Sequence, residues 1–342
     1  MSFKRLDPED FVVSSDSITA TLWSTGAPTL SQFFTSSVQE AGSSGDFYLA
    51  VYQTASTLTE ATPQFEIAYA DSLGSGSVLY NSAVPQKSPS LTTYGQYRSL
   101  ILEDENATFT FGIPGKGSNT LTATHFWVIS IDRARYKESL FPGSLNLKLS
   151  GSGGIEEIQL TDDSQDNPVN QFLGSSRVLQ LISGSNGTAG SLANSGYVAG
   201  SGSYGLVFPD LGTIILNPDA ISQSIHVDTL RNSNTDDNNP RILFNAIADG
   251  ASFALNSEET ITSDYIFVRA RNSEFNYSEN PSFISGSTGE VIYDNFINHP
   301  QVYATTIGMY NDSNELLAVA KLSRPLLKDF TKESLVRVKL DF

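Results

Sequence analysis

The last nine residues of the chain read Ser334-Leu335-Val336-Arg337-Val338-Lys339-Leu340-Asp341-Phe342. From Val336 onward, apolar residues alternate with charged ones, and this period of two is typical of a strand that buries one face. A chain end frays unless a sheet or a partner holds it. The stretch therefore predicts a terminal strand over residues 336–342, with the final carboxylate at a sheet edge or at an interface.

Short strand-like runs recur through the rest of the chain, and Gly, Ser, Pro and Asn residues separate them. Before residue 150 the runs cover residues 18–23, 47–52, 64–69, 99–102, 108–111, 125–132 and 144–149. After it they cover residues 157–160, 177–183, 205–209, 212–216, 241–248, 252–255, 264–271, 303–310 and 316–322. The polar run Asn311-Asp312-Ser313-Asn314 lies between the last two and predicts a hairpin.

Signals for helices are few. Residues 28–34 could open one short helix, and Asn217, Pro218 and Asp219 mark the start of another, because Asn caps a helix and Pro suits its first position. The composition, rich in Phe and Tyr and poor in Met, also favours strands. We therefore expect a mainly β protein, made of antiparallel β-sandwich-like domains with one or two short helices.

Two loose segments suggest boundaries along the chain. A Gly/Ser run follows residue 149, and a polar loop covers residues 232–240. We expect an N-terminal β-sandwich domain over residues 1–150, a middle β-rich region with Gly/Ser loops and a short helix over 151–240, and a C-terminal β domain over 241–342. The sequence leaves open whether these regions are separate domains or one intertwined sheet system.

Composition excludes several classes of function. The net charge of −17 argues against sequence-independent nucleic-acid binding, since a polyanion repels an acidic protein. The sequence has no cysteine, which excludes disulfides and thiolate chemistry. No apolar stretch resembles a secretory signal or a membrane span. We expect a chain that is made in a cytoplasm and stays soluble.

Catalytic and metal-binding motifs are weak throughout. Gly200, Gly202 and Gly205 match a dinucleotide-binding pattern but precede a strand rather than a helix. The acidic runs at 162–166 and 236–239 lack the Gly and Glu of a calcium-binding EF-hand, and solvated loops are the favoured interpretation. Glu66 and Glu105 could serve as glycosidase carboxylates only if a pocket brings two acids together. We expect no catalytic residue, no metal ligand and no cofactor.

A basic cluster in this acidic chain is a candidate docking patch. Arg133, Arg135 and Lys137 follow a strand, and an acidic partner surface would complement them. Sugar binding is a second hypothesis, because Trp23 and Trp127 could stack on a carbohydrate ring. Trp127 lies in an apolar run, however, which favours a position in the core.

Three stretches resemble virion structural proteins of contractile-tailed, T4-like bacteriophages, especially marine cyanophages. These stretches are residues 3–17, residues 94–106 with 132–145, and residues 270–278 with 305–323. The resemblance spans most of the chain and implies a non-enzymatic tail subunit, in the virion and assembled in the host cytoplasm, with the baseplate wedge as the preferred position. A neck or capsid-associated position and a receptor-binding module of the tail remain as alternatives.

Assembly through strand edges then gives a set of expected interface residues. The partners would be other baseplate or tail subunits, with a homo-oligomer also possible, and exposed edges would be covered on assembly. The expected interface residues are Arg133, Arg135, Lys137, Phe275, Tyr277, Val336, Val338, Leu340 and Phe342.

Overall fold

A computed structural model of the chain describes residues 4–22, 34–35, 48–52, 62–74, 90–112, 121–150, 157–168, 171–190, 202–222, 225, 238–276 and 280–341. The chain divides into two compact units. The central unit is Ile18–Glu259, and the terminal unit combines Met1–Ser17 with Thr260–Phe342. The three consecutive regions expected from the sequence, 1–150, 151–240 and 241–342, do not correspond to these units, because strand pairing joins segments across both expected boundaries.

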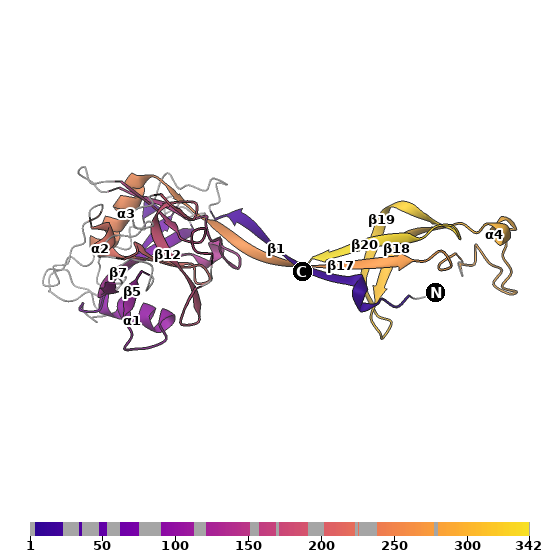
Figure 1. Cartoon of the computed structure of the whole chain (residues 1–342), viewed down its shortest axis with the longest axis horizontal. Coiled ribbons are helices and arrows are strands. Elements are labelled where there is room, and N and C mark those ends of the chain that lie inside the picture. Colours follow the sequence, from indigo (N-terminus) through magenta and orange to yellow (C-terminus); the bar gives the residue numbers. More distant parts are fainter. Residues whose placement is uncertain are drawn as a thin grey trace. The chain divides into compact units, whose positions relative to one another are not determined.

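The central unit is built on a 12-stranded sheet whose neighbouring strands pair in antiparallel fashion (Figure 1). In spatial order its main path is β16 (Phe253–Ala254), β9 (Asn146–Leu149), β10 (Ile158–Asp162), β12 (Ser176–Ser185), β14 (Gly205–Phe208), β15 (Thr213–Leu216), β7 (His125–Ile131), β4 (Pro63–Asp71), β3 (Tyr48–Tyr52) and β2 (Phe34–Thr35). The short strands β11 (Gln171–Leu173) and β13 (Thr188–Ala189) pair with β12. A separate hairpin joins β5 (Phe109–Phe111) and β6 (Leu121–Ala123).

Both faces of this sheet are buried. Along β4, Phe65 and Ile67 join one apolar cluster, whereas Ala70 joins another, as the alternation of a strand requires. The first cluster includes side chains of α2 (Pro218–Ile221) and α3 (Asn238–Gly250), and the second includes α1 (Ser90–Ile101). Helices therefore cover both sides of the sheet, and the core of the central unit has two layers.

The acidic run at 162–166 is a correction to the sequence analysis, which favoured a solvated loop. Asp162 is 1% exposed, and its carboxylate accepts hydrogen bonds from Gly143 N, at 2.9 Å to each oxygen, and from Ser164 N at 3.1 Å. Asp163 is also buried and accepts from Gln180 N at 2.9 Å. These carboxylates accept hydrogen bonds from backbone N–H groups of the loop and of β12, so they hold the loop together.

We expect Asp162→Ala to lower the free energy of unfolding by about 3 kcal/mol, since two buried N–H groups lose a charged acceptor. Chemical denaturation followed by far-ultraviolet circular dichroism measures this loss. Asp166→Ala is the matched control, because Asp166 is exposed and accepts a single bond, from Ala189 N at 2.7 Å. Equal losses for the two variants would contradict the structural role of Asp162.

The terminal unit contains two small sheets. In one, β17 (Asn256–Ala270) lies between β1 (Phe11–Thr21) and β20 (Ser334–Asp341), and β8 (Ser139–Leu140) of the central unit pairs with the start of β17. The boundary between the units falls within β1 and within β17. The other sheet is the hairpin of β18 (Val302–Tyr310) and β19 (Leu316–Lys328), and the short helix α4 (Asn295–Asn298) precedes it. Single-turn 3-10 helices cover Pro8–Asp10 and, in the central unit, Arg133–Arg135.

The mainly β, antiparallel fold class is confirmed. The hairpin at residues 311–314 is confirmed as well: the Asn311 carboxamide oxygen accepts from Ser313 N and Glu315 N at 3.0 and 2.8 Å. The helix start at Asn217 is also present, with its side chain accepting from Asp219 N at 3.1 Å. Four α-helices occur among the described residues instead of one or two, because the strands expected at 99–102 and 241–248 lie in α1 and α3. The helix expected at 28–34 and Trp23 lie outside the residues that the structure describes, apart from Phe34 in β2.

Candidate assembly surface

The terminal unit has almost no core of its own. Of the 45 buried hydrophobic side chains among the described residues, only Ile266, Phe283 and Val338 belong to it. Both apolar clusters described above consist of central-unit residues. Because apolar burial is the main force that stabilises folded structure, this unit gains little of that stabilisation internally.

The terminal unit instead exposes large apolar side chains. They are Phe11, Val12, Val13, Phe275, Ile292, Tyr293, Ile297, Tyr303, Tyr310, Leu316, Leu317, Val319, Phe330 and Leu335. The described part of the much longer central unit exposes only six: Ile18, Tyr48, Leu73, Leu91, Leu100 and Phe172. Single exposed apolar residues are normal, but such a concentration in one unit is typical of a surface that another protein covers.

The hairpin β18–β19 is the largest exposed element. No third strand pairs with it among the described residues, and an isolated two-stranded sheet is marginally stable in water. Its apolar side chains include Leu316, 53% exposed, and Val319, 58% exposed. At Gly308 an added Cβ would lie 2.9 Å from the Tyr310 ring, so the absence of a side chain there leaves room for this ring. The hairpin thus presents an apolar surface without a cover of its own.

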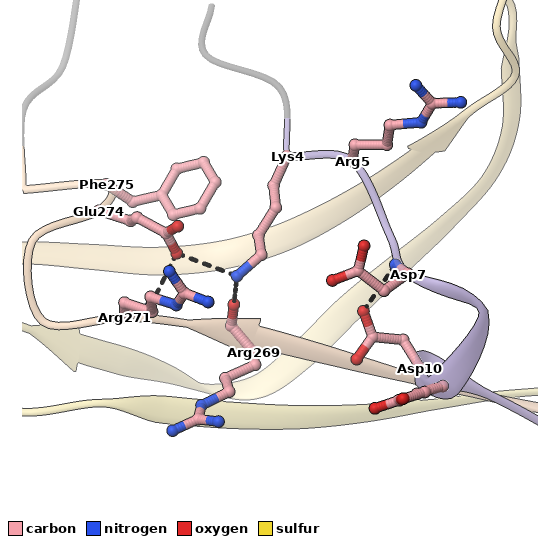
Figure 2. A pocket seen from close by; sticks show the side chains of 9 residues that line it. Lys4, Arg5, Asp7, Asp10, Arg269, Arg271, Glu274 and Phe275 are labelled. Atoms are coloured by element: carbon pink, nitrogen blue, oxygen red, sulfur yellow. Dashed lines mark hydrogen bonds and ion pairs between the residues drawn. The ribbon is translucent and has the colours of Figure 1, made fainter.

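A pocket of about 610 Å³ lies between residues 4–10 and residues 269–275 of the terminal unit (Figure 2). Lys4 Nζ donates to Glu274 at 3.1 Å and to the carbonyl of Arg269, and Glu274 also accepts from Arg271 N at 2.9 Å. The lining contains equal numbers of cationic and anionic side chains: Lys4, Arg5, Arg269 and Arg271 against Asp7, Glu9, Asp10 and Glu274. These contacts fasten the N-terminal segment to the loop after β17.

A general acid in this pocket would be a carboxyl group that is protonated near neutral pH. The Glu274 carboxylate instead accepts from Arg271 N and pairs with Lys4, and these contacts lower its pKa. Glu274 therefore stays ionised and holds the N-terminal segment through its ion pair with Lys4, whereas a general acid must carry a proton.

Phe275 is the one expected interface residue at this pocket. Its ring is 38% exposed, and its φ of +53° is in the left-handed region that bulky residues rarely adopt. The loop is held by Lys328, which is 3% exposed and donates to Asn272 O at 3.0 Å and to Asn276 Oδ1 at 3.2 Å. A buried ammonium thus fixes the loop that displays Phe275. Tyr277 lies outside the described residues.

The expected interface residues of β20 that the structure describes all lie on one face of the strand. β20 pairs with β17 from Ser263↔Asp341 to Ala270↔Ser334 and forms an edge of the described sheet. Val338 is 6% exposed, and Val336 and Leu340 are half-buried, so these three side chains face the unit's interior. Leu335 is 65% exposed and is the apolar residue of β20 that a partner could reach. Phe342 lies outside the described residues.

The basic cluster lies in the central unit. Arg133 donates to Tyr136 O at 2.7 Å, and its guanidinium lies 4.5 Å from the centre of the Tyr136 ring. Arg135 is half-buried, and Lys137 is exposed. Arg133 is therefore engaged in a local turn, and Lys137 is the most accessible cation of the three.

The sequence analysis missed the exposed residues of β1 and of the hairpin β18–β19. Phe11, Val12 and Val13 are 46%, 49% and 66% exposed. The sequence signal was the run of three consecutive apolar residues. Because successive side chains of a strand point to opposite faces, such a run places apolar side chains on both faces of β1, and both faces then need another surface packed against them. The hairpin was predicted, but its lack of a third strand was not.

Glu66 gives a prediction about pH. Burial, and then the charge of Asp132, raise the pKa of Glu66 above its usual value of 4.5. Because the folded state binds the Glu66 proton more tightly than the unfolded state, the contribution of Glu66 to the free energy of unfolding is fully present below pH 4.5. This contribution is lost as the pH rises through the folded-state pKa. We expect Glu66→Gln to raise the denaturation midpoint at neutral pH and to leave it unchanged below pH 4.5. Glu105→Gln, an exposed substitution, is the control, and equal effects of Glu66→Gln at both pH values would contradict the assignment.

Comparisons of the whole sequence with protein-family models, with curated proteins and with solved structures each found no match. Across the described ranges, no three His, Cys, Asp or Glu side chains come together in a group that could hold a metal ion. The helices in the described part of the chain are all too short or too polar to cross a membrane.

Proposed function

We propose that this protein is a structural subunit of a contractile bacteriophage virion, most plausibly in the baseplate wedge of the tail, and that it acts by assembly rather than catalysis. The terminal unit is its docking module and the central unit is its stable body. The observation that carries this proposal is the contrast between the units: among its described residues, the terminal unit has three buried hydrophobic side chains and fourteen large exposed ones.

The contrast supports assembly for a physical reason. Exposed apolar surface and open strand edges cause aggregation unless they are covered, and subunit interfaces cover them. A unit whose apolar surface is covered by partner subunits becomes fully ordered only when it binds those partners. Under this proposal, assembly would therefore be limited to the growing particle. The position in the tail rests on the resemblance to virion proteins of the three stretches named in the sequence analysis.

A sugar-binding module of the tail is the second candidate, and the structure weakens the observation behind it. Trp127 has no exposed surface, and its indole N–H donates to Asn239 O at 3.0 Å. This ring supports the core and is not available for stacking on a carbohydrate.

Immunogold labelling of intact virions tests the proposal. Antibodies raised against the purified chain are expected to label the distal end of the tail. Label at the neck or head would replace the baseplate position by one of the alternative structural positions. Complete absence of the chain from purified virions, checked by mass spectrometry, would overturn the proposal.

A further inference from the structure

Two strand edges of the terminal unit are open at the same time. β17 has β1 on one side and β20 on the other, and no further strand pairs with either among the described residues. Phe11, Val12 and Val13 are exposed on β1, and Leu335 is exposed on β20. Long edge strands are usually protected by charges, Pro residues or covering segments. Within this unit β1 carries a single charge, Asp16, and no Pro.

The two edges are electrostatically complementary. β20 presents Arg337 and Lys339 on its exposed face, next to Tyr265 of β17, whose ring centre lies 5.5 and 5.9 Å from their charged groups. β1 presents Asp16, and the acidic residues Asp7, Glu9 and Asp10 precede it. One edge is therefore cationic at its centre and the other is anionic, which favours their meeting in two different copies.

Strand direction and register also agree. β20 is antiparallel to β17. β1 is antiparallel to β17 as well, because Leu22 N donates to Leu255 O whereas Ser257 Oγ, further along β17, donates to Ala20 O, earlier on β1. β1 and β20 therefore run in the same direction, and copies stacked side by side would pair β20 with β1 in parallel.

Aligning the first residues of the two strands sets Leu335 beside Val12, Val336 beside Val13 and Lys339 beside Asp16 of the next copy. This register forms two apolar pairs and sets the one charge of β1 beside a cation. Pairing of β20 with itself is less favourable, because each antiparallel register centred on Arg337, Val338 or Lys339 sets two cations opposite each other.

We propose that copies of this chain join head to tail by strand addition, with the β20 edge of one copy against the β1 edge of the next. Such a heterologous contact builds a ring when its rotation closes and a helical stack when it does not. The proposal refines the assembly role proposed above and names the partner: a second copy of the same chain. Main-chain hydrogen bonds supply affinity, and the contact between Lys339 and Asp16 selects the register.

Charge reversal in the full-length chain tests the contact. Sedimentation velocity is expected to show mass increasing with concentration for the natural chain. Asp16→Lys and Lys339→Glu are each expected to weaken this association about tenfold, because an attraction becomes a repulsion. Within one chain the pKa of Lys339 is raised by its contact with Asp341, at 2.8 Å, and also by the charge of Asp16, so circular dichroism must first show that each variant is folded. Asp312→Lys and Lys332→Glu, at exposed positions outside the two edges, are the matched controls and are expected to associate normally.

Mixing separates an intermolecular contact from one within a chain. Each single variant is expected to associate only weakly with itself, but an alternating mixture of Asp16→Lys with Lys339→Glu offers an opposite charge at every contact and is expected to restore association. Three results would overturn the proposal. They are a mixture that does not regain association, a Lys339→Glu variant that associates as well as the natural chain, and a natural chain that stays monomeric at every concentration. A monomeric chain that still labels the virion would overturn head-to-tail pairing alone, whereas self-association without virion labelling would overturn the tail role alone.

Discussion

A chain truncated after Glu333 should fail to enter particles, while its central unit keeps its fold. Removing β20 takes away eight residues paired with β17 and one of the three buried apolar side chains of the terminal unit, Val338. The central unit contains both apolar clusters and depends on neither. Limited proteolysis should therefore release a stable fragment near residues 18–259, and incorporation should fall to background. Normal incorporation of the truncated chain would contradict a docking role for the terminal unit.

Two point variants of β20 separate folding from docking. Val338→Asp places a carboxylate in a position that is 6% exposed, which should destabilise the terminal unit by about 3 kcal/mol. Leu335→Asp changes a side chain that is 65% exposed, so the unit should remain folded and only association should weaken. Proteolysis rates report the first effect, and incorporation into particles reports the second.

The second large effect is expected in the central unit. Trp127→Ala should lower the free energy of unfolding by about 3–5 kcal/mol, because it empties a fully buried site and removes an indole hydrogen bond. That bond, of 3.0 Å to Asn239 O, joins the sheet to α3, and the ring also contacts Tyr69, with 6.3 Å between the ring centres. Urea denaturation followed by far-ultraviolet circular dichroism measures the loss.

Phe172→Ala is the control for this variant. Phe172 lies on β11 of the same sheet, but it is 64% exposed, so its removal should change the unfolding free energy by only about 0.5 kcal/mol. If both variants unfolded at the same urea concentration, Trp127 would not be a core residue of a cooperative unit.

Local patterns predicted the strands well, because alternation and turn residues act over a few positions. The alternation in β20 is the clearest case: Val336, Val338 and Leu340 face inward, whereas Arg337 and Lys339 face outward. The turn at Asn311 is equally local, since its own side chain accepts two backbone N–H groups.

The two helices that were predicted as strands show where short windows fail. Residues 241–248 contain an apolar run that fits either element, and length must decide between them. In α3 the buried residues Asn239, Leu243, Ala246, Ile247 and Gly250 recur at helical spacing over a longer window than the run itself. In α1, Tyr94 and Ile101 are seven residues apart on one helix face.

The division into units was beyond local reasoning. It depends on β1 pairing with β17, strands that are more than two hundred positions apart in the sequence. The same holds for the assembly surface, because the absence of a third strand beside β18 and β19 is a property of the whole fold. Local sequence patterns named only the basic cluster, Phe275, Tyr277 and the final strand as candidates.

The terminal unit draws on both ends of the sequence, and this has a consequence for the order of events on the ribosome. Residues 18–259 emerge before β20 has been translated, so the central unit can fold while β1 still lacks the sheet that it will join. The docking sheet becomes complete only after residues 334–341 have left the exit tunnel. Nascent and prematurely terminated chains therefore carry a folded body without a complete terminal sheet, and under the proposed assembly role this would keep unfinished subunits out of the particle.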